Sequence, residues 1–159
     1  MECMKTILFV CTANIARSPM AEALFNQMVK EKGLDDQYRA ESAGTWGLDG
    51  FMAAEDGQLV MRERGLDTSS HRSRVVSEEI VQNADLILAM EAGHVEALKI
   101  EFWSKEDSIY LLSEMAGPAY DIRDPHQRGR ARFEATAQEL EGILENGFEK
   151  ILELASKET

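Results

Sequence analysis

Apolar runs and helical periodicity alternate along this chain. The run Ile7 to Val10 is rich in strand-forming residues and ends at Cys11. A helical pattern follows from about Ser18 to Lys32, with apolar residues three and four positions apart, and Gly33 is a typical C-cap. Ser18 suits the N-cap and Pro19 the first helical position. The first 33 residues therefore predict a strand, a tight loop and a helix.

The same alternation continues to the end of the chain. Further strands are predicted at about 38–43, 85–90 and 108–112, and further helices at about 53–64, 77–83, 91–102 and 130–155. Gly142 and Gly147 are weak points in the last helix. Strands that alternate with helices indicate a parallel α/β sheet covered on both faces. In such sheets ligands bind beyond the carboxyl ends of the strands, which is where Cys11 falls.

Length and charge narrow the possible functions. The 159 residues fit one domain, residues 1–159. No apolar run approaches the length of a signal peptide core or a membrane span. Cys3 and Cys11 are too close together in one predicted strand for a structural disulfide, so we expect a protein of the reducing cytoplasm. A net charge of −12 argues against nucleic acids and anionic membranes as partners.

The first strand, loop and helix together predict an anion-binding site. The loop N–H groups and the helix dipole place partial positive charge at the same point. Arg17 adds a planar, charged group suited to phosphate oxygens. Positive surroundings favour the nucleophilic thiolate form of a cysteine such as Cys11. A cysteine after an apolar strand can equally be a buried, inert residue, so the spacing alone leaves both interpretations open.

Three separated motifs then resemble the low-molecular-weight protein tyrosine phosphatases. They are Cys11 followed after five residues by Arg17-Ser18, the segment Ser42 to Thr45, and the pair Asp124-Pro125. The resemblance extends over nearly the whole chain. It implies a three-layer sandwich with a four-stranded parallel sheet flanked by helices on both faces. It also implies hydrolysis of phosphotyrosine through a cysteinyl-phosphate intermediate, without metal or cofactor.

The resemblance assigns catalytic and phosphate-binding roles. Cys11 would be the nucleophile, and Asp124 the general acid that later acts as base on water. Asp121 is a competing acid, and Asp-Pro is also a common turn pair. Phosphoryl oxygens would be bound by the Arg17 guanidinium and by the loop residues Thr12, Ala13, Asn14, Ile15, Ala16, Arg17 and Ser18.

Further positions match residues that support the loop or line the cleft in this family. The supporting hydrogen-bond network would contain Asn14, Ser18, Ser42 and His71, with Ser18 donating to the Cys11 thiolate. The substrate cleft would contain Ile15, Trp46 and His126. A surface-loop histidine is the simpler interpretation of His71, and a core residue at the solvent edge that of Trp46. Ile15 favours an aromatic phosphoester, because the family's arginine phosphatases tend to carry Thr there.

The chain departs from the family pattern at three positions. Ala16 replaces a second cysteine that protects the nucleophile in many members, so we expect irreversible oxidation of Cys11 by peroxide. Ala13 stands where Gly is frequent, at a cost of about 1 kcal/mol if the backbone there has positive φ. His126 follows the Asp-Pro pair where aromatic residues are common.

Partners and alternatives follow from the same resemblance. A phosphotyrosine-containing protein, such as a tyrosine kinase, is the expected partner, and phosphate or other oxyanions are expected inhibitors. Protein-arginine phosphatase is the main alternative. Arsenate reduction would need additional cysteines, and only Cys3 is available besides Cys11. A catalytically silent anion-binding module is the third alternative.

Overall fold

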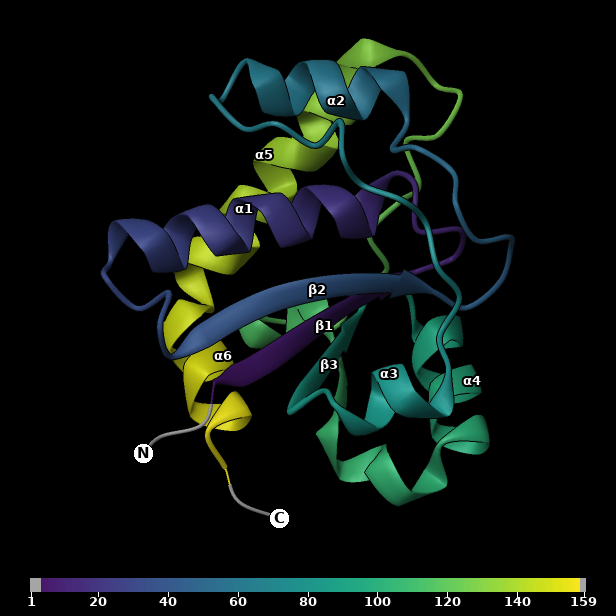
Figure 1. The fold of residues 1–159 in the computed structure, drawn as a ribbon, viewed down its shortest axis with the longest axis vertical. Coiled ribbons are helices and arrows are strands. Elements are labelled where there is room, and N and C mark those ends of the chain that lie inside the picture. Colours follow the sequence, from purple (N-terminus) through teal and green to yellow (C-terminus); the bar gives the residue numbers. More distant parts are fainter. Residues whose placement is uncertain (1–3, 158–159) are drawn as a thin grey trace.

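A four-stranded parallel sheet forms the middle layer of the protein (Figure 1). The structure is a computed structural model that describes residues 4–157, so Cys3 lies outside the described residues. The strand order is β2-β1-β3-β4. The strands are β1 (Lys5–Cys11), β2 (Tyr38–Gly44), β3 (Leu86–Ala89) and β4 (Ile109–Leu111).

Helices cover both faces of this sheet, which confirms the predicted three-layer sandwich (Figure 1). One face is covered by α1 (Arg17–Glu31), α5 (Arg130–Asn146) and α6 (Phe148–Ala155), with α2 (Glu55–Arg62) packed outside on α5. The other face is covered by α3 (Glu78–Gln82), α4 (Ala92–Glu101) and the 3₁₀ helix η1 (Trp103–Ser108). A second 3₁₀ helix, η2 (Leu112–Met115), follows β4. In the described part of the chain, no helix is long and apolar enough to cross a bilayer.

The central strand β1 explains why the sheet is buried on both sides. Successive side chains of a strand point to opposite faces. Ile7 and Phe9 accordingly belong to the core under α1 and α5, while Leu8 and Val10 belong to the core under α4. All four are at most 1% exposed. The strand thus places Cys11 at the carboxyl edge of the sheet with little freedom to move.

Two details of the helices differ from the sequence predictions. Helix α1 begins at Arg17 with Ala16 as N-cap, so the predicted N-cap role of Ser18 is wrong. The Ser18 hydroxyl contacts Cys11 and Asn14 instead. Pro19 is the third helical residue rather than the first, which the helix tolerates because an N–H there has no acceptor within the helix.

The predicted single helix over 130–155 is interrupted at Gly147, which separates α5 from α6. A Cβ atom at Gly147 would lie 2.8 Å from the Met115 Cβ and 2.9 Å from the Ile143 carbonyl oxygen. The helix therefore breaks where η2 packs against it. Gly142, the other predicted weak point, lies inside α5.

Candidate active site

The candidate site surrounds the loop 12–16 between β1 and α1. Cys11 ends β1, pairs with Gly44 of β2 and is 2% exposed. Its Sγ lies 2.9 Å from the Ser18 hydroxyl oxygen. A Cβ atom on Gly44 would lie 2.5 Å from the Thr12 carbonyl oxygen. The loop thus folds back closely over the end of β2, as only glycine permits.

Arg17 is a buried cation that the rest of the fold holds in place. Its side chain is 1% exposed. Nη1 donates to the Glu91 carboxylate at 2.5 Å and to the Ile122 carbonyl at 2.7 Å. Nε has no hydrogen-bond partner among residues 4–157. Since a buried N–H normally has an acceptor, this free donor on a fixed guanidinium suits an oxyanion such as phosphate.

Asn14 lies at the centre of the predicted supporting network. It is fully buried, and its side-chain amide donates to the hydroxyls of Ser18 at 2.8 Å and Ser42 at 2.9 Å. Its side-chain oxygen accepts the N–H of Arg74 at 3.0 Å. The His71 Nε2 lies 2.7 Å from the Asn14 carbonyl oxygen. The structure therefore brings together all four residues predicted to support the loop.

The strained position in the loop is Asn14 and not Ala13. Asn14 has a φ of 59°, and Gln127 is the only other non-glycine residue with positive φ between residues 4 and 157. Ala13 does not have the positive φ on which its strain cost depended, so no such cost is expected there. Asparagine adopts the left-handed region more readily than most residues because its short amide can form local hydrogen bonds.

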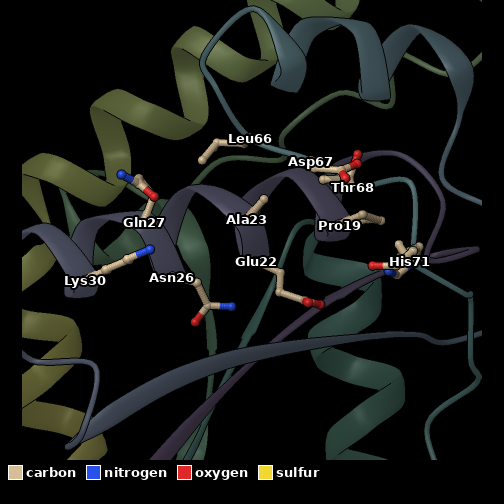
Figure 2. A pocket seen from close by; sticks show the side chains of 11 residues that line it. Pro19, Glu22, Ala23, Asn26, Gln27, Lys30, Leu66, Asp67, Thr68 and His71 are labelled. Carbon is tan, nitrogen blue, oxygen red and sulfur yellow. The ribbon is translucent and has the colours of Figure 1, made fainter.

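A second layer of contacts lies behind the loop. The Ser42 hydroxyl donates to the Glu22 carboxylate at 2.5 Å. Figure 2 shows Glu22 on α1 and His71 on the segment between α2 and α3, both lining a cavity of about 300 Å³. Burial raises the pKa of the Glu22 carboxyl above its ordinary value, although the Ser42 hydrogen bond and the charges of His71 and Arg74 act in the opposite direction.

Asp124 lies next to Arg17, on the loop that precedes α5. Its Oδ2 is 3.8 Å from Arg17 Nη2, and its side chain is 46% exposed. Its Oδ1 accepts the N–H of His126 at 3.0 Å, so the same residue also forms a turn across Pro125. Asp121 instead accepts the N–H of Ala92 at the start of α4. This geometry favours Asp124 over Asp121 as the acid.

The predicted cleft residues differ in their burial. Ile15 is half-buried, and its carbonyl accepts the N–H of Ala54. The backbone N–H of Trp46 donates to the Thr12 carbonyl at 3.0 Å, while the Trp46 residue is 75% exposed. Trp46 is therefore not a core residue. Other exposed apolar residues follow it, namely Leu48, Phe51 and Met52, and His126 is exposed beside Asp124.

Two residues near the loop were not predicted from the sequence. Glu91 is the N-cap of α4 and binds Arg17. His94 is 7% exposed and its Nε2 lies 2.9 Å from the Thr12 hydroxyl oxygen. Burial and the charge of Arg17 lower the pKa of His94. Glu91 could have been found, because it follows a buried strand at the carboxyl edge of the sheet, whereas no sequence signal marks His94.

Comparisons with known proteins agree with this geometry. A profile described as "Low molecular weight phosphotyrosine protein phosphatase" matches residues 6–157. The low molecular weight protein-tyrosine-phosphatase YfkJ of Bacillus subtilis is 34% identical over 159 residues, which cover 98% of each chain. A protein-arginine-phosphatase of Bacillus subtilis is also 34% identical, over 87% of this chain and 91% of that protein.

The fold is also similar to that of a solved structure. The crystal structure of a low molecular weight protein tyrosine phosphatase from T. tengcongensis has a TM-score of 0.87 and 37% identity to this chain. The match covers 92% of this chain and 99% of that one. Together with the match of the family profile over residues 6–157, this similarity shows that the chain belongs to the low molecular weight phosphotyrosine protein phosphatase family.

Proposed function

We propose that this protein is a single-domain cysteine-dependent phosphatase that hydrolyses phosphotyrosine through a cysteinyl-phosphate intermediate. The observation that carries the proposal is the arrangement of Cys11, Arg17 and Asp124 around one loop. Cys11 ends β1 before the loop, Arg17 begins α1 after it, and Arg17 Nη2 is 3.8 Å from Asp124 Oδ2. A nucleophile, an anion-binding group and an acid are what phosphoryl transfer to cysteine needs.

In the first step the Cys11 thiolate attacks phosphorus. The Ser18 hydroxyl, 2.9 Å from Sγ, donates to the thiolate and stabilises its charge. A bond forms between Sγ and phosphorus as the bond from phosphorus to the tyrosine oxygen breaks. Asp124 transfers its proton to that oxygen, so that tyrosine leaves as a neutral phenol.

Hydrogen-bond donors that the fold holds in position would stabilise the negative charge on the phosphoryl oxygens. The backbone N–H groups from Thr12 to Ser18 and the Nε and Nη2 of Arg17 would donate to these oxygens. Glu91 and the Ile122 carbonyl fix the other side of the guanidinium. Because these donors are held by the fold, little reorganisation is needed during the reaction.

In the second step water hydrolyses the intermediate. The Asp124 carboxylate accepts a proton from the water as its oxygen attacks phosphorus. The bond between phosphorus and Sγ breaks, phosphate leaves, and the Cys11 thiolate and the protonated Asp124 are restored. Since phosphate is the product, phosphate and related oxyanions are expected to inhibit competitively.

Phosphotyrosine is preferred over phosphoarginine because of the apolar surroundings of the loop. Half-buried Ile15 and exposed Trp46 can pack against an aromatic ring. Protein-arginine phosphatase remains the second candidate, because this chain is 34% identical to a protein of that name. We place the activity in the cytoplasm, on phosphotyrosine-containing proteins such as a tyrosine kinase, with no role for nucleic acid or membranes.

The test compares phosphate release from phosphotyrosine and phosphoarginine peptides in the presence of a chelator. Cys11→Ser is expected to abolish turnover and Asp124→Asn to reduce it by about 100-fold or more. Asp121→Asn is the matched control and should keep most of the activity. Preference for phosphoarginine would retain the mechanism but overturn the role of Ile15. No turnover of either peptide would indicate an anion-binding module.

A further inference from the structure

A hydrogen-bonded chain joins α4 to the loop on the side of Arg17. His94 is the third residue of α4, and its Nδ1 accepts the backbone N–H of Glu91 at 3.2 Å. Its Nε2 lies 2.9 Å from the Thr12 hydroxyl oxygen. Because Nδ1 is an acceptor, the proton of the neutral imidazole is on Nε2. His94 therefore donates to Thr12 and does not accept from it.

The surroundings of His94 favour this neutral form. Burial lowers the pKa of His94 below its ordinary value of 6.5, and the charge of Arg17 lowers it further. Three carboxylates act in the opposite direction without reversing the shift, namely Glu91, Asp121 and Asp124. At neutral pH the ring is thus uncharged and keeps its proton on Nε2.

The hydrogen-bond capacity of the Thr12 hydroxyl then determines where its proton points. A hydroxyl oxygen has two lone pairs and one proton. The two lone pairs face the N–H groups of His94 Nε2 at 2.9 Å and Arg17 Nη2 at 3.5 Å. The hydroxyl proton is left for a third partner, and among residues 4–157 no acceptor lies within hydrogen-bond distance of it.

The Thr12 hydroxyl lies beside the groups that the proposed reaction uses. Thr12 directly follows Cys11 in the chain. The same Arg17 Nη2 lies 3.5 Å from the Thr12 hydroxyl oxygen and 3.8 Å from the Oδ2 of Asp124. The substrate phosphoryl group must lie between the nucleophile, this guanidinium edge and the acid. A half-buried hydroxyl at this edge, held in one direction by two donors, is suited to an anionic oxygen.

We propose that the Thr12 hydroxyl donates a hydrogen bond to the transferring phosphoryl group, and that His94 is the positioning residue that aims it. This inference rests on the proposed phosphatase function, since it adds one donor to the same reaction. The donor would act on any tetrahedral oxyanion in the loop, including inorganic phosphate. A hydrogen bond to a charged oxygen is strong enough that its loss should reduce kcat/KM about tenfold or more.

Thr12→Val tests the hydroxyl, because valine keeps the shape of threonine but cannot donate. We expect kcat/KM for a small aryl phosphate to fall about tenfold and the inhibition constant of inorganic phosphate to rise about as much. Thr12→Ser keeps the hydroxyl and should recover most of what Thr12→Val loses in both measurements. Wild-type values in Thr12→Val would overturn the inference. An inactive wild type would instead overturn the proposed phosphatase function.

A double-mutant cycle tests the role of His94. His94→Leu should reduce kcat/KM in the wild-type background but cause no further loss in Thr12→Val, since the two residues act as one unit. His94→Gln offers an amide N–H to Thr12 and should restore most of the activity. Equal losses from His94→Leu in both backgrounds would show that His94 acts through Glu91 and Arg17 instead. Urea midpoints of all variants identify any loss that reflects unfolding.

Discussion

Replacing Asn14 tests whether side-chain hydrogen bonds hold the loop in its left-handed conformation. Asn14→Ala removes three hydrogen bonds, to Ser18, Ser42 and the backbone of Arg74. At about 1 kcal/mol each, these bonds contribute about 3 kcal/mol. Alanine at a φ of 59° adds about 1 kcal/mol of backbone strain. The expected loss of about 4 kcal/mol is a large part of the 5–15 kcal/mol typical of a domain.

The matched control is Asn14→Gly, which loses the same hydrogen bonds but adopts positive φ without strain. It should be about 1 kcal/mol more stable than Asn14→Ala. Urea unfolding followed by circular dichroism measures both, and the alanine variant should unfold at a urea concentration about 2 M below the wild type. A loss below 1 kcal/mol in Asn14→Ala, or an alanine variant more stable than the glycine variant, would refute this reasoning.

The remaining predictions concern glycine contacts, pH and oxidation. Gly44→Ala should lower the urea midpoint and impair turnover, because its Cβ would lie 2.5 Å from the Thr12 carbonyl oxygen. Gly142→Ala has open space around its Cβ and should stabilise α5 by about 0.5–1 kcal/mol. Equal urea midpoints for the two variants would contradict this expectation. Burial raises the pKa of Glu22, so the unfolded chain releases this proton first as pH rises above the ordinary value of 4.5. The free energy of unfolding should therefore fall as pH rises above about 4.5, until the folded protein also loses the proton. That fall should be smaller in Glu22→Gln, and an identical fall would show that Glu22 is not its source. Peroxide should inactivate the enzyme irreversibly because Ala16 offers no thiol to protect Cys11; full recovery of activity with a thiol reductant would disprove this.

The sequence was sufficient to predict the layers of the fold, and the candidate residues Cys11, Arg17 and Asp124 that it marked lie around one loop in the structure. Apolar runs such as Ile7 to Val10 mark strands whose order along the chain implies a parallel sheet. The short spacing from Cys11 to Arg17 means that a single stretch of sequence contains the whole loop proposed to bind phosphate. The resemblance then added Asp124, which the structure places 3.8 Å from Arg17.

Other features depend on contacts that sequence patterns do not record. Helix α1 starts at Arg17 because the Ser18 hydroxyl is used by Cys11 and Asn14 rather than for capping. The break at Gly147 depends on the packing of Met115, which is remote in sequence. The contact between His94 and Thr12 spans 82 residues. Tertiary packing decides such features, and local periodicity carries no signal for them.

The contacts of Arg17 also determine when the candidate site can be completed during synthesis and folding. Its guanidinium is bound to Glu91, 74 residues later, and to the Ile122 carbonyl, 105 residues later. Contacts between such distant segments form slowly, because the intervening chain must lose its freedom first. During synthesis, a nascent chain that ends before Ile122 lacks one acceptor for this buried cation and also lacks Asp124. Cys11, the proposed nucleophile, is therefore synthesised early, whereas the Ile122 carbonyl and the proposed acid Asp124 come only with the last third of the chain.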